Sequence, residues 1–238
     1  MRKIKFVVGK IYHIYNRGVE KRNIFLDDSD RWRFLQGMYL FNDEATSSNL
    51  LFRLERDKGR ANFRTLKEFI SDREKERKPL VKIMADSLMP NHFHLILEET
   101  IEGGISRFMH KLGIGYTKYF NKRHERVGGL FQGPFRAVQV DDELYLQYLL
   151  VYLNVINPGQ LIELKLKEEG VKNINAILKF TREYDWSTHK EYINLRDSVI
   201  IDKGILGEIF DTPEKYLEFA EMVLEGKKYE AIDRLTFE

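Results

Sequence analysis

Two histidines separated by a single residue stand at the start of an apolar run, within Met89-Pro90-Asn91-His92-Phe93-His94-Leu95-Ile96-Leu97. Successive side chains of a β-strand point to opposite faces, so His92 and His94 should share one face while Phe93 occupies the other. Two imidazoles at that separation can hold one metal ion. The pair supplies only two ligands, however, so the pattern also fits a solvated or hydrogen-bonded histidine pair on a half-exposed strand.

A second group of reactive side chains lies near the middle of the chain, where Tyr145, Tyr148 and Tyr152 fall within eight residues of a stretch that ends at Asn157-Pro158. A tyrosine phenolate can attack phosphorus and form a covalent intermediate. A metal ion beside a scissile phosphate withdraws charge and orients it for in-line attack. A histidine pair on a strand facing a helix with a tyrosine and an amide would assemble such a site. At least two of the three tyrosines should nevertheless be structural.

The elements that would position these residues follow from apolar periodicity and from capping and turn residues. Strands are predicted over residues 7–16, 80–88, 92–98 and 135–140. Helices are predicted after the capping residues 28–30, over about 104–123, after Asp141-Asp142 as far as Pro158, over 174–184 and over 213–224. The order is that of the α+β ferredoxin-like β-α-β-β-α-β core, followed by a further helix. Residues 1–160 should form this core domain, with an accessory insertion at about 45–78, and residues 161–238 a helical C-terminal extension.

Charge is unevenly distributed along the 238 residues, although the formal net charge is only +2. Residues 106–126 hold six basic residues and one acidic residue, whereas residues 207–238 hold nine acidic and four basic residues. A basic middle and an acidic end favour a polyanion-binding face that avoids the C-terminus. There are no cysteines and no run that approaches a membrane span, so we expect a cytoplasmic protein with no membrane partner.

Several motifs together resemble the single-tyrosine HUH transposases, in particular the REP-associated tyrosine transposases. The residues that carry the resemblance are 12–18 (Tyr-His-Ile-Tyr-Asn-Arg-Gly), 88–97, 116–121 (Tyr-Thr-Lys-Tyr-Phe-Asn), 129–136 (Gly-Leu-Phe-Gln-Gly-Pro-Phe-Arg), the helix that ends at Asn157-Pro158 and, more weakly, 186–189 (Trp-Ser-Thr-His). The combination of Met-Pro-Asn-His-Phe-His with Phe-Gln-Gly-x-Phe is far more specific than either string alone.

The resemblance implies a ferredoxin-like catalytic domain that cleaves and transfers single-stranded DNA. It implies a divalent ion, Mg²⁺ or Mn²⁺, held by His92 and His94, with the side chain of Asn157 as a third ligand. It also implies that a helix tyrosine cleaves DNA and stays joined to the 5′ phosphate, leaving a free 3′-OH. Recognition of hairpin DNA, a homodimer and a nucleoid-associated location are further implications.

One spacing departs from the family pattern, in which the tyrosine lies four residues before the asparagine. Here that position is Leu153, and Tyr152 lies five residues before Asn157. Five residues turn an α-helix by roughly 500°, which would take Asn157 off the Tyr152 face. A one-residue π-bulge would restore the alignment, and such bulges are frequent at functional sites. We therefore assign Tyr152 as the nucleophile, with Tyr148 as the alternative.

Candidate DNA contacts come from the basic segment and from the ends of two strands. They are Arg107, Lys111, Lys118, Lys122 and Arg123, together with Arg17 and Arg136. These cations would neutralise phosphates, and Tyr116, Tyr119 or Phe120 would stack on bases. The alternatives are that the arginines form structural ion pairs and that the aromatic residues, which recur at helical spacing, belong to the core.

Two other functions fit the same sequence. A host-adopted hairpin-DNA-binding protein with weak catalysis would explain the shifted spacing of Tyr152 and Asn157. An RNA-binding ferredoxin-like module would make the histidine pair incidental. Metal-dependent nicking and a covalent adduct distinguish the transposase from both.

Overall fold

The computed structural model describes residues 4–45, 66, 68 and 77–226. The predicted accessory insertion at about 45–78 therefore lies almost entirely outside the described residues. Over the described ranges, no helix is long and apolar enough to cross a membrane.

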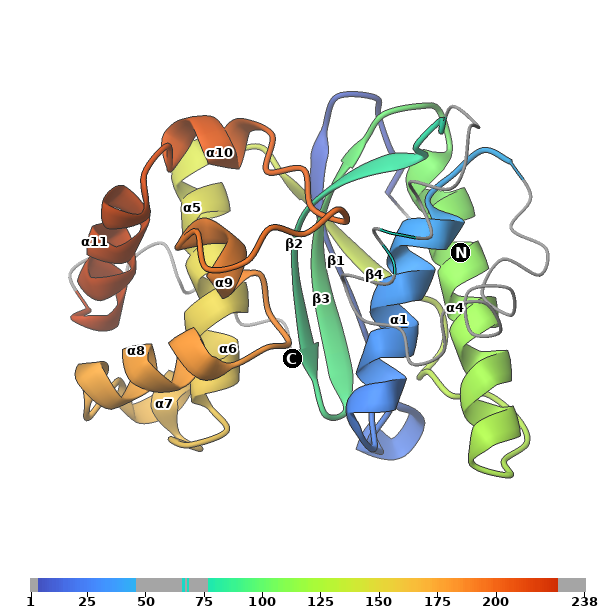
Figure 1. Cartoon of the computed structure of the whole chain (residues 1–238), viewed down its shortest axis with the longest axis horizontal. Coiled ribbons are helices and arrows are strands. Elements are labelled where there is room, and N and C mark those ends of the chain that lie inside the picture. The colour runs from blue at the N-terminus through green and yellow to red at the C-terminus, as the bar shows by residue number, and fades with distance from the viewer. Residues whose placement is uncertain (1–3, 46–65, 67, 69–76, 227–238) are drawn as a thin grey trace.

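A four-stranded antiparallel sheet forms the centre of the molecule (Figure 1). Its strands are β1 (Ile11–Arg17), β2 (Val81–Met89), β3 (His92–Glu99) and β4 (Arg136–Val140), in the order β2-β3-β1-β4. Each neighbouring pair is antiparallel, which is the ferredoxin-like arrangement and confirms the predicted fold class. β1 begins four residues later than expected, because residues 7–10 form a turn in which Lys10 N–H donates to Val7 O and Gly9 has a φ of 78°.

Two helices, α1 (Asp28–Phe41) and α4 (Gly104–Arg123), cover one face of the sheet (Figure 1). A short 3₁₀ turn, Val19–Lys21, lies between β1 and α1. Asp27 caps α1 by accepting from Asp30 N–H at 3.1 Å, and the buried Glu99 accepts from Ile105 N–H at 2.8 Å at the start of α4. Apolar residues at alternate positions, such as Phe93, Leu95 and Leu97, form the core of this layer.

The opposite face is covered by a continuous helical segment made of three parts. α5 (Glu143–Val151) is capped by Asp142 and runs into a π-helix, η2 (Tyr152–Ile156), and then into α6 (Asn157–Gly159). The C-terminal extension lies on this side too, as α7 (Leu166–Glu169), α8 (Ile174–Glu183), α9 (His189–Tyr192), α10 (Ile205–Ile209) and α11 (Pro213–Leu224) (Figure 1). The sheet is therefore the middle of three layers.

Backbone hydrogen bonds attach the extension to β2. Leu88 N–H donates to Trp186 O at 2.7 Å, Thr188 N–H to Asp86 O at 3.1 Å, and Asp202 N–H to Ile83 O at 2.9 Å. The division at residue 160 remains a prediction, but these bonds make the extension part of the support of the sheet.

A buried carboxyl lies at this junction. Burial, together with the nearby charge of Glu191, raises the pKa of Asp86 to about 7, although Arg196 opposes the shift. A carboxyl whose pKa is higher in the folded state binds its proton more tightly there than in the unfolded state. The free energy of unfolding of the protein therefore falls as the pH rises from about 4 to 7.

We predict that Asp86→Asn, which cannot ionise, becomes more stable relative to the wild type between pH 5 and pH 8, by up to about 3 kcal/mol. Urea unfolding at both pH values measures the change. The exposed Asp185 is the control position, and the change with pH measured for Asp86→Asn is compared with that of Asp185→Asn. A difference for Asp86→Asn that is independent of pH would contradict the raised pKa.

Candidate functional site

The face of the sheet toward α5 and η2 carries the histidine pair. The ring centroids of His92 and His94 are 5.0 Å apart on β3. Tyr15 and Ser87 are the neighbours of His94 on β1 and β2. Phe93 lies on the other face within the core, as strand alternation predicted.

His92 is held between two asparagines. Its Nδ1 lies 2.6 Å from Asn91 Oδ1, and its Nε2 lies 3.4 Å from Asn157 Oδ1. An amide oxygen only accepts, so Nδ1 donates to Asn91 Oδ1 at the shorter distance. In a neutral imidazole with its proton on Nδ1, Nε2 carries the lone pair and makes no hydrogen bond to Asn157 Oδ1. Gln160 and Ser87 bond the side chain of Asn157, at 3.3 and 3.5 Å. The basic nitrogen of His92 thus points toward the amide oxygen of Asn157.

His94 is buried and has a third histidine beside it. Burial holds the pKa of His94 well below its usual value, and the charges of His92, His13 and Lys167 add to the effect. His13 Nε2 on β1 lies 2.8 Å from His94 Nδ1. A neutral imidazole is the metal-binding form, and with Nδ1 bonded to His13 the ligand atom of His94 would be Nε2.

The π-helix brings Tyr152 and Asn157 to the same histidines. Asn157 N–H donates to Tyr152 O, five residues back, which is the π-type bond. Asn157 consequently faces His92, and the Tyr152 ring lies 5.6 Å from the His94 ring in an edge-on arrangement. The bulge that the five-residue spacing called for is present.

The two candidate tyrosines have different surroundings. Tyr152 is 4% exposed, and its hydroxyl oxygen accepts from Lys167 Nζ at 2.7 Å. Tyr148 is fully buried and packs against Phe219 of α11, with ring centroids 5.5 Å apart, and desolvation raises its pKa. Of the two tyrosines, Tyr152 therefore lies beside the histidines, whereas Tyr148 packs against α11.

An open cleft of about 750 Å³ leads to the histidines. It is lined by Tyr15, Asn16, Arg17, Lys21, Asn91, His92, His94, Gln132 and Arg136. Arg17 and Arg136, two of the predicted DNA contacts, thus line the same cleft as the histidine pair. Arg17 Nε donates to Gln132 Oε1, which orients its guanidinium.

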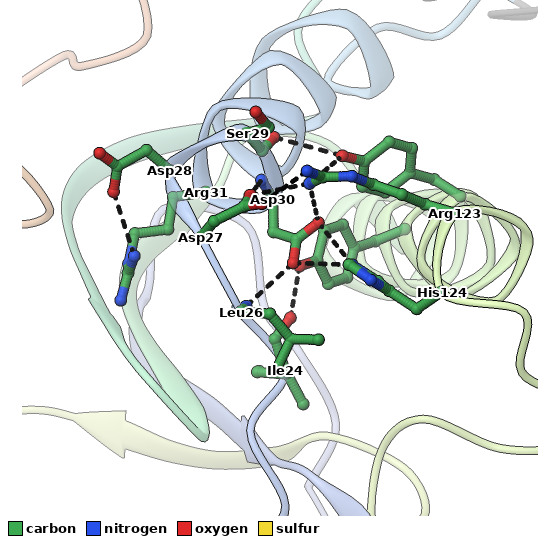
Figure 2. A network of polar contacts seen from close by, with 11 residues as sticks. Ile24, Leu26, Asp27, Asp28, Ser29, Asp30, Arg31, Arg123 and His124 are labelled. Carbon is green, nitrogen blue, oxygen red and sulfur yellow. Dashed lines mark hydrogen bonds and ion pairs between the residues drawn. The ribbon is translucent and has the colours of Figure 1, made fainter.

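The five basic residues of α4 that were predicted to contact DNA do not line this cleft. Arg123 bonds Asp27 and the buried Asp30, and His124 adds a contact to Asp30 at 3.0 Å (Figure 2). Lys111 donates to Asp43 O at 2.5 Å, and Arg107 lies 3.8 Å from Glu44. Lys118 lines a separate, mainly apolar groove with Phe131 and Phe135.

The aromatic residues of α4 belong mostly to the core. Tyr116 and Phe120 are each 2% exposed, and the Tyr116 hydroxyl donates to Ile24 O. Tyr119 is partly buried and contacts Ser29 O at 3.4 Å. These aromatic residues therefore fit the alternative prediction, that they belong to the core, better than the prediction that they stack on bases.

Several side chains at the site were not singled out from the sequence. His13 belongs to the motif at 12–18 but was given no role of its own, although it shares one face of β1 with Tyr15 and Arg17 by strand alternation. Lys21 lies outside the motifs. Lys167 lies 15 residues after Tyr152, and no local pattern marks it. Among the described residues, no cluster of three or more His, Cys, Asp or Glu side chains could hold a metal, so the candidate set depends on the amide of Asn157.

Part of the chain is similar to a known family. Residues 59–155 match the family model described as "Transposase IS200 like". This segment contains the motifs at 88–97 and 129–136 and ends two residues before Asn157, and it confirms the resemblance predicted from them. No curated protein matches the chain. A solved "Structure of the REP associates tyrosine transposase bound to a REP hairpin" is similar to 85% of this chain and 96% of that chain, with 12% identity and a TM-score of 0.45.

We predict that Arg123→Ala lowers the free energy of unfolding by roughly 2 kcal/mol, because it removes the guanidinium that pairs with the fully buried Asp30. Lys122→Ala, at an exposed position on the same helix, should change stability by less than about 0.5 kcal/mol. Chemical denaturation measures both. The Arg123 bond also holds the pKa of Asp27 below its usual value, so the deficit should shrink in acid. Equal stability of the two variants would show that Arg123 is not structural.

Proposed function

We propose that this chain, which carries the IS200-like transposase segment, cleaves single-stranded DNA and transfers the strand through a 5′-phosphotyrosine intermediate on Tyr152. The observation that carries this proposal is the π-helix, which aligns Tyr152 with His94 and Asn157 with His92. A nucleophile, two imidazoles and an amide oxygen then converge beside a cleft with basic walls.

The donor set of this site suits a weakly bound divalent ion. His92 Nε2, His94 Nε2 and Asn157 Oδ1 would hold it, and Asn91 and His13 would orient the two imidazoles. Such an ion, Mg²⁺ or Mn²⁺, would withdraw charge from the scissile phosphate. Imidazoles alone favour softer ions, and Mg²⁺ usually relies on substrate phosphate, so a site completed by DNA suits this mixed set.

The reaction uses the phenol of Tyr152 as nucleophile. Its O–H bond breaks and the proton passes to water, while the oxygen forms a bond to the phosphorus. The bond from phosphorus to the 3′ oxygen breaks, and that oxygen takes a proton from water to become the free 3′-OH. Rejoining is the reverse, with a 3′-OH attacking the phosphotyrosine.

The walls of the cleft would bind the DNA backbone. Arg17, Lys21 and Arg136 line it and can neutralise phosphates, and Gln132 orients Arg17. Arg123, Lys111 and Arg107 contact backbone carbonyls or acidic side chains of their own chain, so their part in binding DNA is smaller than the sequence suggested. The proposal includes recognition of hairpin DNA, a homodimer and a nucleoid-associated cytoplasmic location, as the motif resemblance implies.

A second candidate function is hairpin-DNA binding with little or no cleavage. The observation that favours it is that Tyr152 is only 4% exposed and bonded to Lys167, so DNA must reach a nearly buried phenol. The five-residue spacing supports it less, because the π-helix restores the alignment.

We predict that His92→Ala and His94→Ala weaken Mn²⁺ binding at least about tenfold in the presence of a hairpin oligonucleotide. Free Mn²⁺ is measured by electron paramagnetic resonance, with all proteins carrying Tyr152→Phe so that no cleavage occurs. His110→Ala, on α4, is the control and should bind as the parent does. If both histidine variants bind Mn²⁺ with the affinity of the parent protein, the proposed metal site is wrong.

We predict that Tyr152→Phe abolishes a covalent protein–DNA adduct, since it removes only the nucleophilic hydroxyl. Tyr148→Phe should retain the adduct, because Tyr148 packs against Phe219 instead of the histidines. A denaturing gel after incubation with labelled single-stranded hairpin DNA and Mg²⁺ or Mn²⁺ gives the result. An adduct that survives Tyr152→Phe but is lost in Tyr148→Phe would identify Tyr148, one helical turn earlier, as the nucleophile. If the wild type forms no adduct on any hairpin, the binding-only function is favoured.

A further inference from the structure

We propose that Lys167 is a catalytic residue, which holds the reacting oxygen of Tyr152 and stabilises negative charge on it during cleavage and rejoining. This inference rests on the proposed function, because it assumes that Tyr152 is the nucleophile. It assigns a chemical role to the C-terminal extension, in which Lys167 lies.

The contact is made to the atom that would react. Lys167 Nζ donates to the Tyr152 hydroxyl oxygen at 2.7 Å and lies 4.7 Å from the centroid of the same ring. The ammonium is therefore close to both the oxygen and the ring over which a phenolate delocalises its charge. Charge-assisted hydrogen bonds of this kind are stronger than neutral ones, so the bond should tighten as negative charge develops.

The fold of residues 159–173 delivers this lysine. Leu166, next to it on α7, is 2% exposed and belongs to the core of the α5 layer. A Cβ on Gly159 would lie 3.0 Å from Leu166 Cδ1, so glycine lets α7 approach α6 closely. The Glu163 carboxylate accepts from the backbone N–H groups of Lys172 and Asn173, both at 3.1 Å, and closes the loop. Lys167 therefore projects from an anchored turn.

The neighbouring lysines have different partners. Lys165 and Lys172 bond Glu169, at 2.9 and 2.8 Å. Lys167 carries the contact to the phenol, although three lysines of similar reach lie within eight residues. If the lysines served only to keep this turn soluble in water, Lys167 and Lys165 would be expected to have similar surroundings.

In the cleavage step, the Tyr152 proton goes to water as described above, and Lys167 keeps its own protons. Its ammonium faces the phenolic oxygen while negative charge builds there before the bond to phosphorus forms. In rejoining, the same oxygen leaves phosphorus with the bonding electron pair, and the ammonium again lies beside it. By microscopic reversibility, loss of Lys167 should slow both directions.

A purely structural role would have different consequences. Lys167 is exposed, and hydrogen bonds from exposed lysines contribute little to stability. Removal of its charge should therefore leave the fold, DNA affinity and Mn²⁺ affinity unchanged while slowing the chemistry. A clamp that holds Tyr152 in a resting position would instead speed adduct formation when it is removed.

The experiment compares Lys167→Met, Lys167→Arg and the control Lys165→Met in single-turnover cleavage and rejoining of a labelled hairpin oligonucleotide. We expect Lys167→Met to slow both rates roughly ten- to a hundredfold. Lys167→Arg should recover part of the loss, and Lys165→Met should match the wild type. Melting temperature and DNA affinity, measured by fluorescence anisotropy, should be equal in all four proteins.

A second measurement tests charge directly. Replacement of Tyr152 by 3,5-difluorotyrosine, whose phenolic oxygen holds negative charge better, should speed Lys167→Met more than it speeds the wild type. The absence of any such rescue would overturn the charge role. Wild-type or faster rates in Lys167→Met would also overturn it, the faster case identifying a clamp.

Failure of this inference and failure of the proposed function give different patterns. The inference alone fails if the wild type forms an adduct, Tyr152→Phe does not, and Lys167→Met matches the wild type. The proposed function fails, and the inference with it, if Tyr152→Phe retains the adduct or the wild type forms none.

Discussion

The backbone hydrogen bond from Asn157 N–H to Tyr152 O is the constraint on which the candidate site depends. In an α-helical continuation of α5, residues five apart point in directions that differ by roughly 140°. The wider π turn brings both side chains back to one face, where His92 and His94 lie. The two imidazoles come from β3, whereas the phenol and the amide oxygen come from the continuous helical segment, so a change in this one turn would separate them without altering the sheet.

The sheet supports this arrangement because its two faces have different compositions. Phe93, Leu95 and Leu97 are buried against α1 and α4 and fix the position of β3. Because the backbone of β3 is fixed in this way, His92 and His94, at the alternate positions of the strand, are also held in defined positions. β1 does the same with His13, which contacts His94 at 2.8 Å, and with Arg17, which reaches the cleft. A buried apolar face is thus what gives the polar face its defined geometry.

Much of this could be predicted from local sequence. Alternation gave the strands and the shared face of His92 and His94, capping residues gave the starts of α1 and α5, and the distance from Tyr152 to Asn157 indicated the π-bulge. Interactions between distant positions could not be predicted in this way. Arg123 contacts Asp27 and Asp30 across more than ninety residues of sequence, and Lys167 contacts Tyr152 from a part of the extension that lies outside the motifs. A charge run shows that cations are present, but only the fold decides whether their partners are acids of the same chain.

The attachment of the extension to β2 affects whether the sheets of two molecules can associate edge to edge. An uncovered outer strand is a template on which another chain can add a strand and begin aggregation. Trp186, Thr188 and Asp202 exchange backbone hydrogen bonds with β2 and thereby occupy part of that template. The outer strand on the other side, β4, is only five residues long and begins with the exposed Arg136, two features that discourage such pairing. Edge-to-edge growth of the sheet is therefore opposed at both of its outer strands.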